Sequence, residues 1–197
     1  MELKNKIKNR SANIGVIGLG YVGLPLAMEF VRAGFKVTGI DVDNEKVDLI
    51  NAGNNYIQDV NDNALASAVS DGNLTATTDY AVTKRLDSVS ICVPTPLKKQ
   101  KNPDISFIVG AMNEVEKYIH PGMIIILEST TYPGSTRELI LPSLETNDFT
   151  VGKDFFLCFS PERIDPGNTE YGTKNTPKVI GGITEPVSYT HLRAHET

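Results

Sequence analysis

The sequence predicts an α/β fold with a doubly wound, mainly parallel sheet and helices on both of its faces. Apolar segments of strand length alternate with amphipathic segments of helix length, as in a parallel sheet with crossover helices. The first strand and helix are joined by the glycine-rich turn Gly18-Leu19-Gly20-Tyr21-Val22-Gly23, and the next strand ends at the acidic Asp41. A turn of this kind followed by an acid is typical of a Rossmann-type dinucleotide-binding unit.

The expected strands and helices alternate along the chain. Pro25 stands in the first turn of the first helix, where its missing N–H costs nothing, and Gly34 follows this helix, where a left-handed cap is needed. The expected strands cover residues 13–17, 36–40, 88–93, 123–127, 155–159 and 178–182. The expected helices cover residues 24–33, 43–52, 61–70, 105–119 and 135–144.

Composition narrows the class of protein. The chain has 197 residues, of which 40% are hydrophobic and 22% charged, as in a globular domain with a full core. A net charge of -5 argues against nucleic acid or an anionic membrane surface as the main partner. No apolar run approaches the ~20 residues of a membrane helix, and no signal peptide is evident. With only Cys92 and Cys158, both in apolar segments, we expect buried, inert thiols and a cytoplasmic protein.

Residues 188–197 depart from the alternating pattern. They contain two of the three histidines and show no periodicity. We expect a non-native appendage there, with a natural frayed terminus as the alternative. Residues 1–187 are accordingly expected to form one domain.

The glycine-rich turn carries the first functional prediction. Gly18 permits a tight turn, Gly20 lets a pyrophosphate approach the backbone, and Gly23 lets the helix pack closely on the strand. The N-terminus of the following helix offers free N–H groups to the phosphates. Asp41, 18 residues after Gly23, can accept both adenosine ribose hydroxyls and would repel a 2′-phosphate, which favours NAD. The alternative is a turn and a surface acid that bind nothing, and Lys46 lies either near this ribose or in solvent.

Further polar residues follow the later strands, where ligands bind in open parallel sheets. Thr95 lies between two prolines and offers a hydroxyl, and Thr130 lies in a hydroxyl-rich loop near the expected nicotinamide end. Helix capping is the alternative for this loop, above all for Ser135. Glu162 could act as a general base and Arg163 could contact a polar or anionic substrate, unless they form a surface ion pair. His120 is interpreted as a turn residue, and no cluster has the spacing of a metal site.

These motifs in this order resemble the UDP-glucose/GDP-mannose dehydrogenase family. The matching stretches are residues 15–27, Val93-Pro94-Thr95-Pro96, Pro103-Asp104, Glu128-Ser129-Thr130 and Ser160-Pro161-Glu162-Arg163. The resemblance extends over residues 13–182. The sequences of residues 128–134 and 160–167 are most similar to those of the UDP-N-acetylglucosamine 6-dehydrogenase branch.

The resemblance implies an oxidoreductase that converts the C6 alcohol of a UDP-sugar to a carboxylate in two hydride transfers, using two NAD. A cysteine captures the aldehyde as a thiohemiacetal, and water cleaves the thioester that follows. Glu162 would assist this hydrolysis, Thr130 would act at the reacting centre, and Arg163 and Ile164 would line the sugar-nucleotide site. The NAD contacts implied by position are Gly18, Gly20, Tyr21, Val22, Gly23, Asp41, Lys46, Thr95 and Thr130.

Two departures from the family pattern qualify these expectations. Pro133 lies one position later than in some relatives, so Thr130 and Thr131 could exchange roles. The resemblance also places the catalytic cysteine, its Lys and Asn partners and a dimer-forming helix beyond this chain. We therefore expect a full-length homodimer or higher oligomer, and no turnover by this chain alone. A UDP-glucose or UDP-N-acetylmannosamine 6-dehydrogenase, a 3-hydroxyacid-type dehydrogenase and a non-catalytic NAD-binding module stay open as alternatives.

Overall fold

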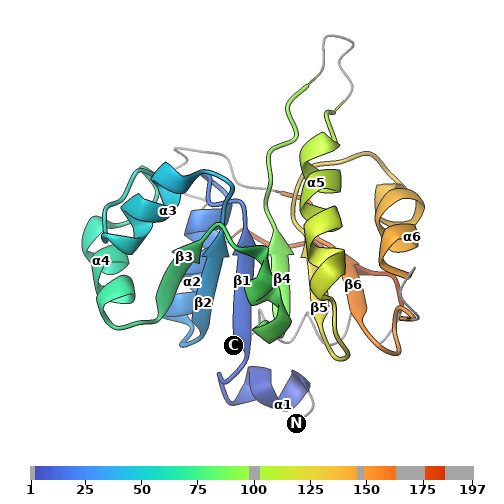
Figure 1. Ribbon diagram of the computed structural model, residues 1–197, viewed down its shortest axis with the longest axis horizontal. Coiled ribbons are helices and arrows are strands. Elements are labelled where there is room, and N and C mark those ends of the chain that lie inside the picture. Colours follow the sequence, from blue (N-terminus) through green and yellow to red (C-terminus); the bar gives the residue numbers. More distant parts are fainter. Residues whose placement is uncertain (1–2, 98–102, 146–148, 163–175, 185–197) are drawn as a thin grey trace.

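A seven-stranded sheet forms the centre of the molecule in the computed structural model, which describes residues 3–97, 103–145, 149–162 and 176–184. The strand order is β3-β2-β1-β4-β5-β6-β7 (Figure 1). All neighbours from β3 to β6 pair in parallel, and β7 is antiparallel to β6. This topology confirms the expected doubly wound fold.

The described elements have the following bounds. The strands are β1 (Asn13–Ile17), β2 (Lys36–Ile40), β3 (Leu74–Thr77), β4 (Ser88–Ile91), β5 (Ile124–Leu127), β6 (Phe156–Phe159) and β7 (Gly181–Gly182). The α-helices are α1 (Leu3–Lys8), α2 (Gly23–Arg32), α3 (Asn44–Asn51), α4 (Asp62–Ser70), α5 (Ser106–Val115) and α6 (Leu141–Leu144). Two 3-10 helices, η1 (Tyr80–Arg85) and η2 (Glu116–Tyr118), and one π-helix, η3 (Thr136–Ile140), complete the set. None of these helices is long and apolar enough to cross a membrane.

The winding direction of the sheet changes at β1. The chain passes from β1 to β2 and β3 on one side, and then returns to β4 on the other side of β1. In the register of the sheet, Ile17 at the end of β1 lies beside both Ile40 and Ile91. The loops that follow these three strands therefore begin at the same edge, over the crevice where open parallel sheets bind their ligands.

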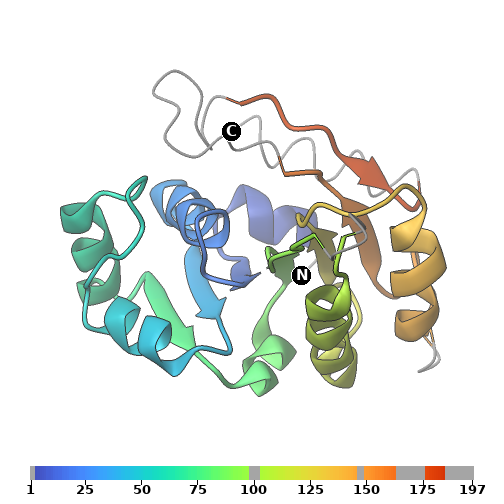
Figure 2. The same cartoon turned by 90° about the horizontal axis from the view of Figure 1, so that it is seen from above.

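Hydrophobic clusters cover both faces of the sheet, which explains why its central strands are apolar throughout. On one face, Ile14 and Val16 of β1 pack with residues of α2, α3 and α4. On the other, Ile91 and Ile125 pack with residues of α5 and α6. The view from above shows α2 and α5 on opposite sides of the sheet (Figure 2).

Several elements differ from the expectation. The last strand, expected over residues 178–182, is the two-residue β7, and the 3-10 helix η1 was not expected. Strand β3 was not expected, because it has only four residues, lies at the edge of the sheet and has alternately buried side chains. Helix α1 was not expected either; Leu3 is buried there and Lys6 pairs with Asp87. The expected helix 135–144 is a π-helix followed by the short α6, because Pro142 has no N–H for an α-helical bond. The side chain of Ser135 makes no capping hydrogen bond in it.

Candidate dinucleotide-binding site

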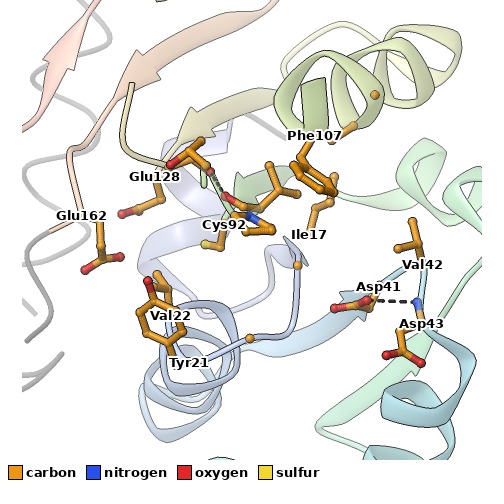
Figure 3. A pocket seen from close by; sticks show the side chains of 18 of the residues that line it. Ile17, Tyr21, Val22, Asp41, Val42, Asp43, Cys92, Phe107, Glu128 and Glu162 are labelled. Atoms are coloured by element: carbon orange, nitrogen blue, oxygen red, sulfur yellow. Dashed lines mark hydrogen bonds between the residues drawn. The ribbon is translucent and has the colours of Figure 1, made fainter. Parts of the chain in front are cut away.

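A pocket of about 710 Å³ lies at the carboxyl edge of the strands, over the crevice between β1 and β4 (Figure 3). Eight of the residues expected to contact NAD line it, together with the predicted base. These are Gly18, Gly20, Tyr21, Val22, Asp41, Lys46, Thr95, Thr130 and Glu162. Arg163 and Ile164 lie outside the described residues.

The three glycines of the turn have different surroundings, each suited to its expected role. Gly18 has a φ of +88°, and a Cβ there would lie 2.7 Å from the carbonyl oxygen of Cys92. A Cβ on Gly23 would lie 1.8 Å from the carbonyl oxygen of Gly18, so only glycine lets α2 approach the strand this closely. A Cβ on Gly20 would meet no atom within 4 Å, which leaves its backbone open to a ligand in the pocket. Gly23 does not itself line the pocket and acts through packing.

The N-terminus of α2 presents unused donors to the pocket. Tyr21 and Val22 line the pocket, and within the described part of the chain their N–H groups make no hydrogen bond and no side chain caps the helix. Such groups must be satisfied by water or by a ligand, and the helix dipole favours an anion. The arrangement can therefore bind a pyrophosphate.

Asp41 is held rigidly at the end of β2. Its side chain is buried and accepts hydrogen bonds from the backbone N–H of Leu19 (2.7 Å) and of Asp43 (3.0 Å). Each carboxylate oxygen keeps a further lone pair, so ribose hydroxyls can still donate to it. Lys46 lies 3.7 Å from this carboxylate and lines the pocket, which places it near the expected ribose rather than in free solvent.

An apolar wall beside Asp41 was not predicted from the sequence. Val42 and Phe107 line the pocket and are 80% and 48% exposed, unusually high values for large apolar side chains. Tyr80 lines the same end, and burial, followed by the charges of Asp41 and Glu114, raises the pKa of its hydroxyl. These side chains offer flat apolar surface to an adenine ring. The sequence carries no signal for this wall, because Phe107 stands next to the core residue Ile108.

Tyr56 supports the turn from behind. Its hydroxyl donates to the carbonyl of Leu19 (2.7 Å), within the glycine-rich turn. Burial, followed by the charges of Asp41 and Asp43, raises the pKa of Tyr56 above its ordinary value, so this donor keeps its proton. The sequence analysis did not identify this residue.

At the opposite end of the pocket, the loop after β5 is hydrogen-bonded to the segment that follows β4. The hydroxyl of Ser129 donates to the carbonyl of Val93 (2.7 Å). Thr130 is exposed and lines the pocket, whereas Thr131 does not line it. The half-buried Glu162 follows β6 and lines the pocket from the neighbouring strand. The geometry therefore favours Thr130 over Thr131 as the residue that a bound dinucleotide would meet.

A buried ion pair at this end was missed by sequence reasoning. Glu128, only 1% exposed, pairs through Oε2 with Nζ of Lys178 at 2.5 Å. Burial raises the pKa of the Glu128 carboxyl; Lys178 acts in the opposite direction, and the nearby Glu162 raises it further. Lys178 follows Glu128 by 50 positions and lies just before β7.

Both cysteines have the properties expected of inert thiols. Cys92 and Cys158 are free and buried. Burial raises the pKa of Cys92 well above its ordinary value and that of Cys158 to about 12, so both stay protonated. His120 lies with Nε2 2.9 Å from the carbonyl oxygen of Leu86, which fits the predicted structural role. The described ranges contain no group of three or more His, Cys, Asp or Glu residues that could hold a metal ion.

Residues 12–195 match the NAD binding domain of the UDP-glucose/GDP-mannose dehydrogenase family. The chain belongs to this family. The resemblance noted in the sequence is therefore confirmed, and NAD is the cofactor of this domain.

Individual relatives and a solved structure agree with this assignment. The chain is 34% identical over 180 residues to a UDP-N-acetyl-D-glucosamine 6-dehydrogenase of Pseudomonas aeruginosa, covering 91% of the chain and 42% of that protein. It is 36% identical over 186 residues to a UDP-N-acetyl-D-mannosamine dehydrogenase of Methanococcus aeolicus, covering 92% and 41%. The structure of an NDP-N-acetyl-D-galactosaminuronic acid dehydrogenase from Methanosarcina mazei Go1 superposes with a TM-score of 0.87 at 29% identity, covering 100% of the chain and 44% of that protein. The chain thus spans about two fifths of the length of these relatives.

Proposed function

We propose that this chain is the NAD-binding part of a UDP-N-acetylhexosamine 6-dehydrogenase, with UDP-N-acetylglucosamine as the sugar nucleotide. One observation carries the proposal: a single pocket runs from Asp41, past the glycine-rich turn, to Glu162 (Figure 3). A dinucleotide laid along it has its adenosine ribose at Asp41 and its pyrophosphate at the N-terminus of α2. Its nicotinamide then lies at the end formed by Thr95, Thr130 and Glu162.

This end of the pocket has the groups that a C6 oxidation needs from this domain. Bound NAD would accept the hydride from the sugar C6. Thr95 and Thr130, which line the pocket at this end, would orient the nicotinamide and the sugar. Glu162 can take a proton from the water that releases the product, with the cysteine supplied from outside this chain. Arg163 and Ile164, which follow Glu162 in sequence, complete the proposed sugar-nucleotide site.

The identity of the sugar is the least constrained part of the proposal. The sequences of the motifs at residues 128–134 and 160–167 favour UDP-N-acetylglucosamine. The UDP-N-acetyl-D-mannosamine dehydrogenase of Methanococcus aeolicus is, however, just as similar to the chain as the UDP-N-acetyl-D-glucosamine 6-dehydrogenase of Pseudomonas aeruginosa. The deciding assay uses the full-length protein with each UDP-sugar and NAD, and follows NADH formation. We expect two NADH per sugar, the highest kcat/KM with UDP-N-acetylglucosamine, and a large loss of kcat with Glu162→Gln.

Three outcomes would contradict this assignment. A higher kcat/KM with UDP-N-acetylmannosamine or UDP-glucose would change the substrate and keep the reaction. Unchanged activity of Glu162→Gln would favour a 3-hydroxyacid-type dehydrogenase, which does not need this loop. NAD binding without oxidation of any UDP-sugar by the full-length protein would favour a non-catalytic NAD-binding module. Assembly of the full-length protein into a homodimer or higher oligomer is part of the proposal and is measured by light scattering.

A further inference from the structure

The charges at the two ends of the pocket are distributed unevenly. At the end of β2, Asp41 and Asp43 lie close together (Figure 3), and Lys46 lies 3.7 Å from the Asp41 carboxylate. At the opposite end, the figure shows Glu128 and Glu162 on one side of the cavity. Both are carboxylates, and the proximity of Glu162 raises the pKa of Glu128. A ligand that carries a positive charge close to both carboxylates would therefore be stabilised by them.

The Glu128–Lys178 ion pair has a defined orientation relative to the pocket. Glu128 lines the pocket, whereas the described Lys178 does not, so the carboxylate stands on the pocket side of the pair. The side chain of Glu128 is 2% exposed and that of Lys178 is 21% exposed. The segment that carries Lys178 is fixed by the pairing of β7 with β6 and by a hydrogen bond from the N–H of Ile183 to the carbonyl of Leu157 (3.0 Å). The pair is therefore a rigid dipole with its negative end towards the cavity.

The nicotinamide ring is the part of the cofactor whose charge changes in the reaction. It carries one positive charge in NAD⁺ and none in NADH. In the orientation derived above, the pyrophosphate lies at the α2 N-terminus and the ring lies towards Glu128. We propose that Glu128, held in place by Lys178, is a specificity residue that makes this pocket favour oxidised over reduced cofactor.

This inference rests on the proposed function, which it deepens. An enzyme that performs two hydride transfers in succession must exchange NADH for NAD⁺ between them. A fixed negative charge beside the ring lowers the affinity for NADH, the product, relative to that for NAD⁺. NADH then leaves more readily and the second NAD⁺ binds more readily. The ion pair thus serves cofactor exchange as well as the attachment of the segment before β7.

The test measures binding of NAD⁺ and of NADH to this chain by isothermal titration calorimetry at mildly alkaline pH. We compare the ratio of the two dissociation constants, Kd(NADH)/Kd(NAD⁺), in the wild type and in Glu128→Gln. A unit charge about 8 Å away, in a medium of effective dielectric constant about 20, supports a change of more than about tenfold before screening by salt. We expect the ratio to fall about threefold or more in the variant.

Two further variants separate this electrostatic role from a structural one. The double variant Glu128→Gln/Lys178→Gln leaves no unpaired charge at the site, and we expect its ratio to fall by a smaller factor. Glu114→Gln is the matched control, because Glu114 also lines the pocket and pairs with a lysine, Lys117, at 2.7 Å, but at the adenosine end. It should shift both dissociation constants equally and leave the ratio unchanged.

The outcomes distinguish the inference from the proposed function. If the wild type binds neither form of the cofactor, the proposed function is wrong. If it binds both, and the single and double variants keep the wild-type ratio, only the inference is overturned, because mere loosening of the site weakens both ligands alike. Thermal melting confirms that each variant is folded, and the double variant decides alone if Glu128→Gln does not fold.

Discussion

Alanine at two glycines of the same turn should have opposite effects on folding and on binding. At Gly23, a new Cβ would lie 1.8 Å from the carbonyl oxygen of Gly18 and 3.2 Å from Cβ of Cys92. At Gly20, a new Cβ would meet no protein atom within 4 Å. We therefore expect Gly23→Ala to destabilise the fold, and Gly20→Ala to leave the fold intact while obstructing the pyrophosphate.

The size of each effect follows from these distances. An ordinary carbon–oxygen contact of about 3.3 Å requires the Gly18 carbonyl to move by about 1.5 Å in Gly23→Ala. Gly18 cannot yield easily, because it has a φ of +88° and is itself packed against the backbone of Cys92. Overpacking costs about 1–3 kcal/mol, and the rigid backbone partner favours the upper value, about 3 kcal/mol. For a chain of this size the melting temperature should fall by about 6–12 °C.

For Gly20→Ala the balance is reversed. Gly20 has no φ in the left-handed region, so alanine is tolerated, and the less flexible unfolded chain adds about 0.4–1 kcal/mol of stability. Loss of one charge-assisted backbone contact to the pyrophosphate should weaken NAD binding by about tenfold or more.

Thermal melting by circular dichroism and NAD titration by calorimetry measure the two effects separately. The reasoning is refuted if Gly23→Ala melts like the wild type. It is equally refuted if Gly20→Ala binds NAD with wild-type affinity, or if it melts several degrees lower. Titration with NADP serves as a control for nonspecific anion binding at the helix N-terminus.

Three further predictions concern single side chains. Asp41→Asn should weaken NAD binding and narrow the preference for NAD over NADP, because one acceptor and the charge facing the 2′-position are lost; calorimetry with both cofactors checks this. Cys92 and Cys158 should resist iodoacetamide in the folded protein, because burial raises both pKa values, and should react fully in urea, as mass spectrometry would show. The raised pKa of Glu128 means that the folded state binds the proton of the Glu128 carboxyl more tightly than the unfolded state does. Its contribution to the free energy of unfolding is thus complete below the ordinary glutamate pKa of about 4.3 and is lost as pH rises through the raised pKa. Urea unfolding at a series of pH values should show the difference between wild type and Glu128→Gln decreasing over that window.

The parts of the site that the sequence predicted depend on short-range geometry. In a βαβ unit the turn, the helix and the next strand have nearly constant lengths, so Asp41 must lie beside the turn that contains Gly18. Thr95 and Glu162 could be placed at the same edge because each directly follows an apolar strand. Parallel pairing brings all such positions together without knowledge of any individual contact.

Other residues of the site depend on which face of an element meets the pocket. Phe107 belongs to a helix whose buried face includes Ile108, Ala111 and Met112. From the sequence alone, an adjacent apolar residue reads as part of the same core. Only the placement of α5 against β4 and β5 turns Phe107 away from that core and into the cavity.

The Glu128–Lys178 pair shows why the remaining part of the site could not be predicted. A carboxylate after a parallel strand is expected at the open edge, where water stabilises its charge. Glu128 is instead buried, which is costly unless a cation compensates. That cation, Lys178, comes from a segment whose course depends on the antiparallel pairing of β7 with β6. Strand β7 has only two residues, which is too short for a sequence signal, and the sequence predicted a longer strand over residues 178–182. The sequence could therefore indicate where charged groups gather, while their pairing, and with it the charge that faces the pocket, depends on a long-range contact that only the folded chain defines.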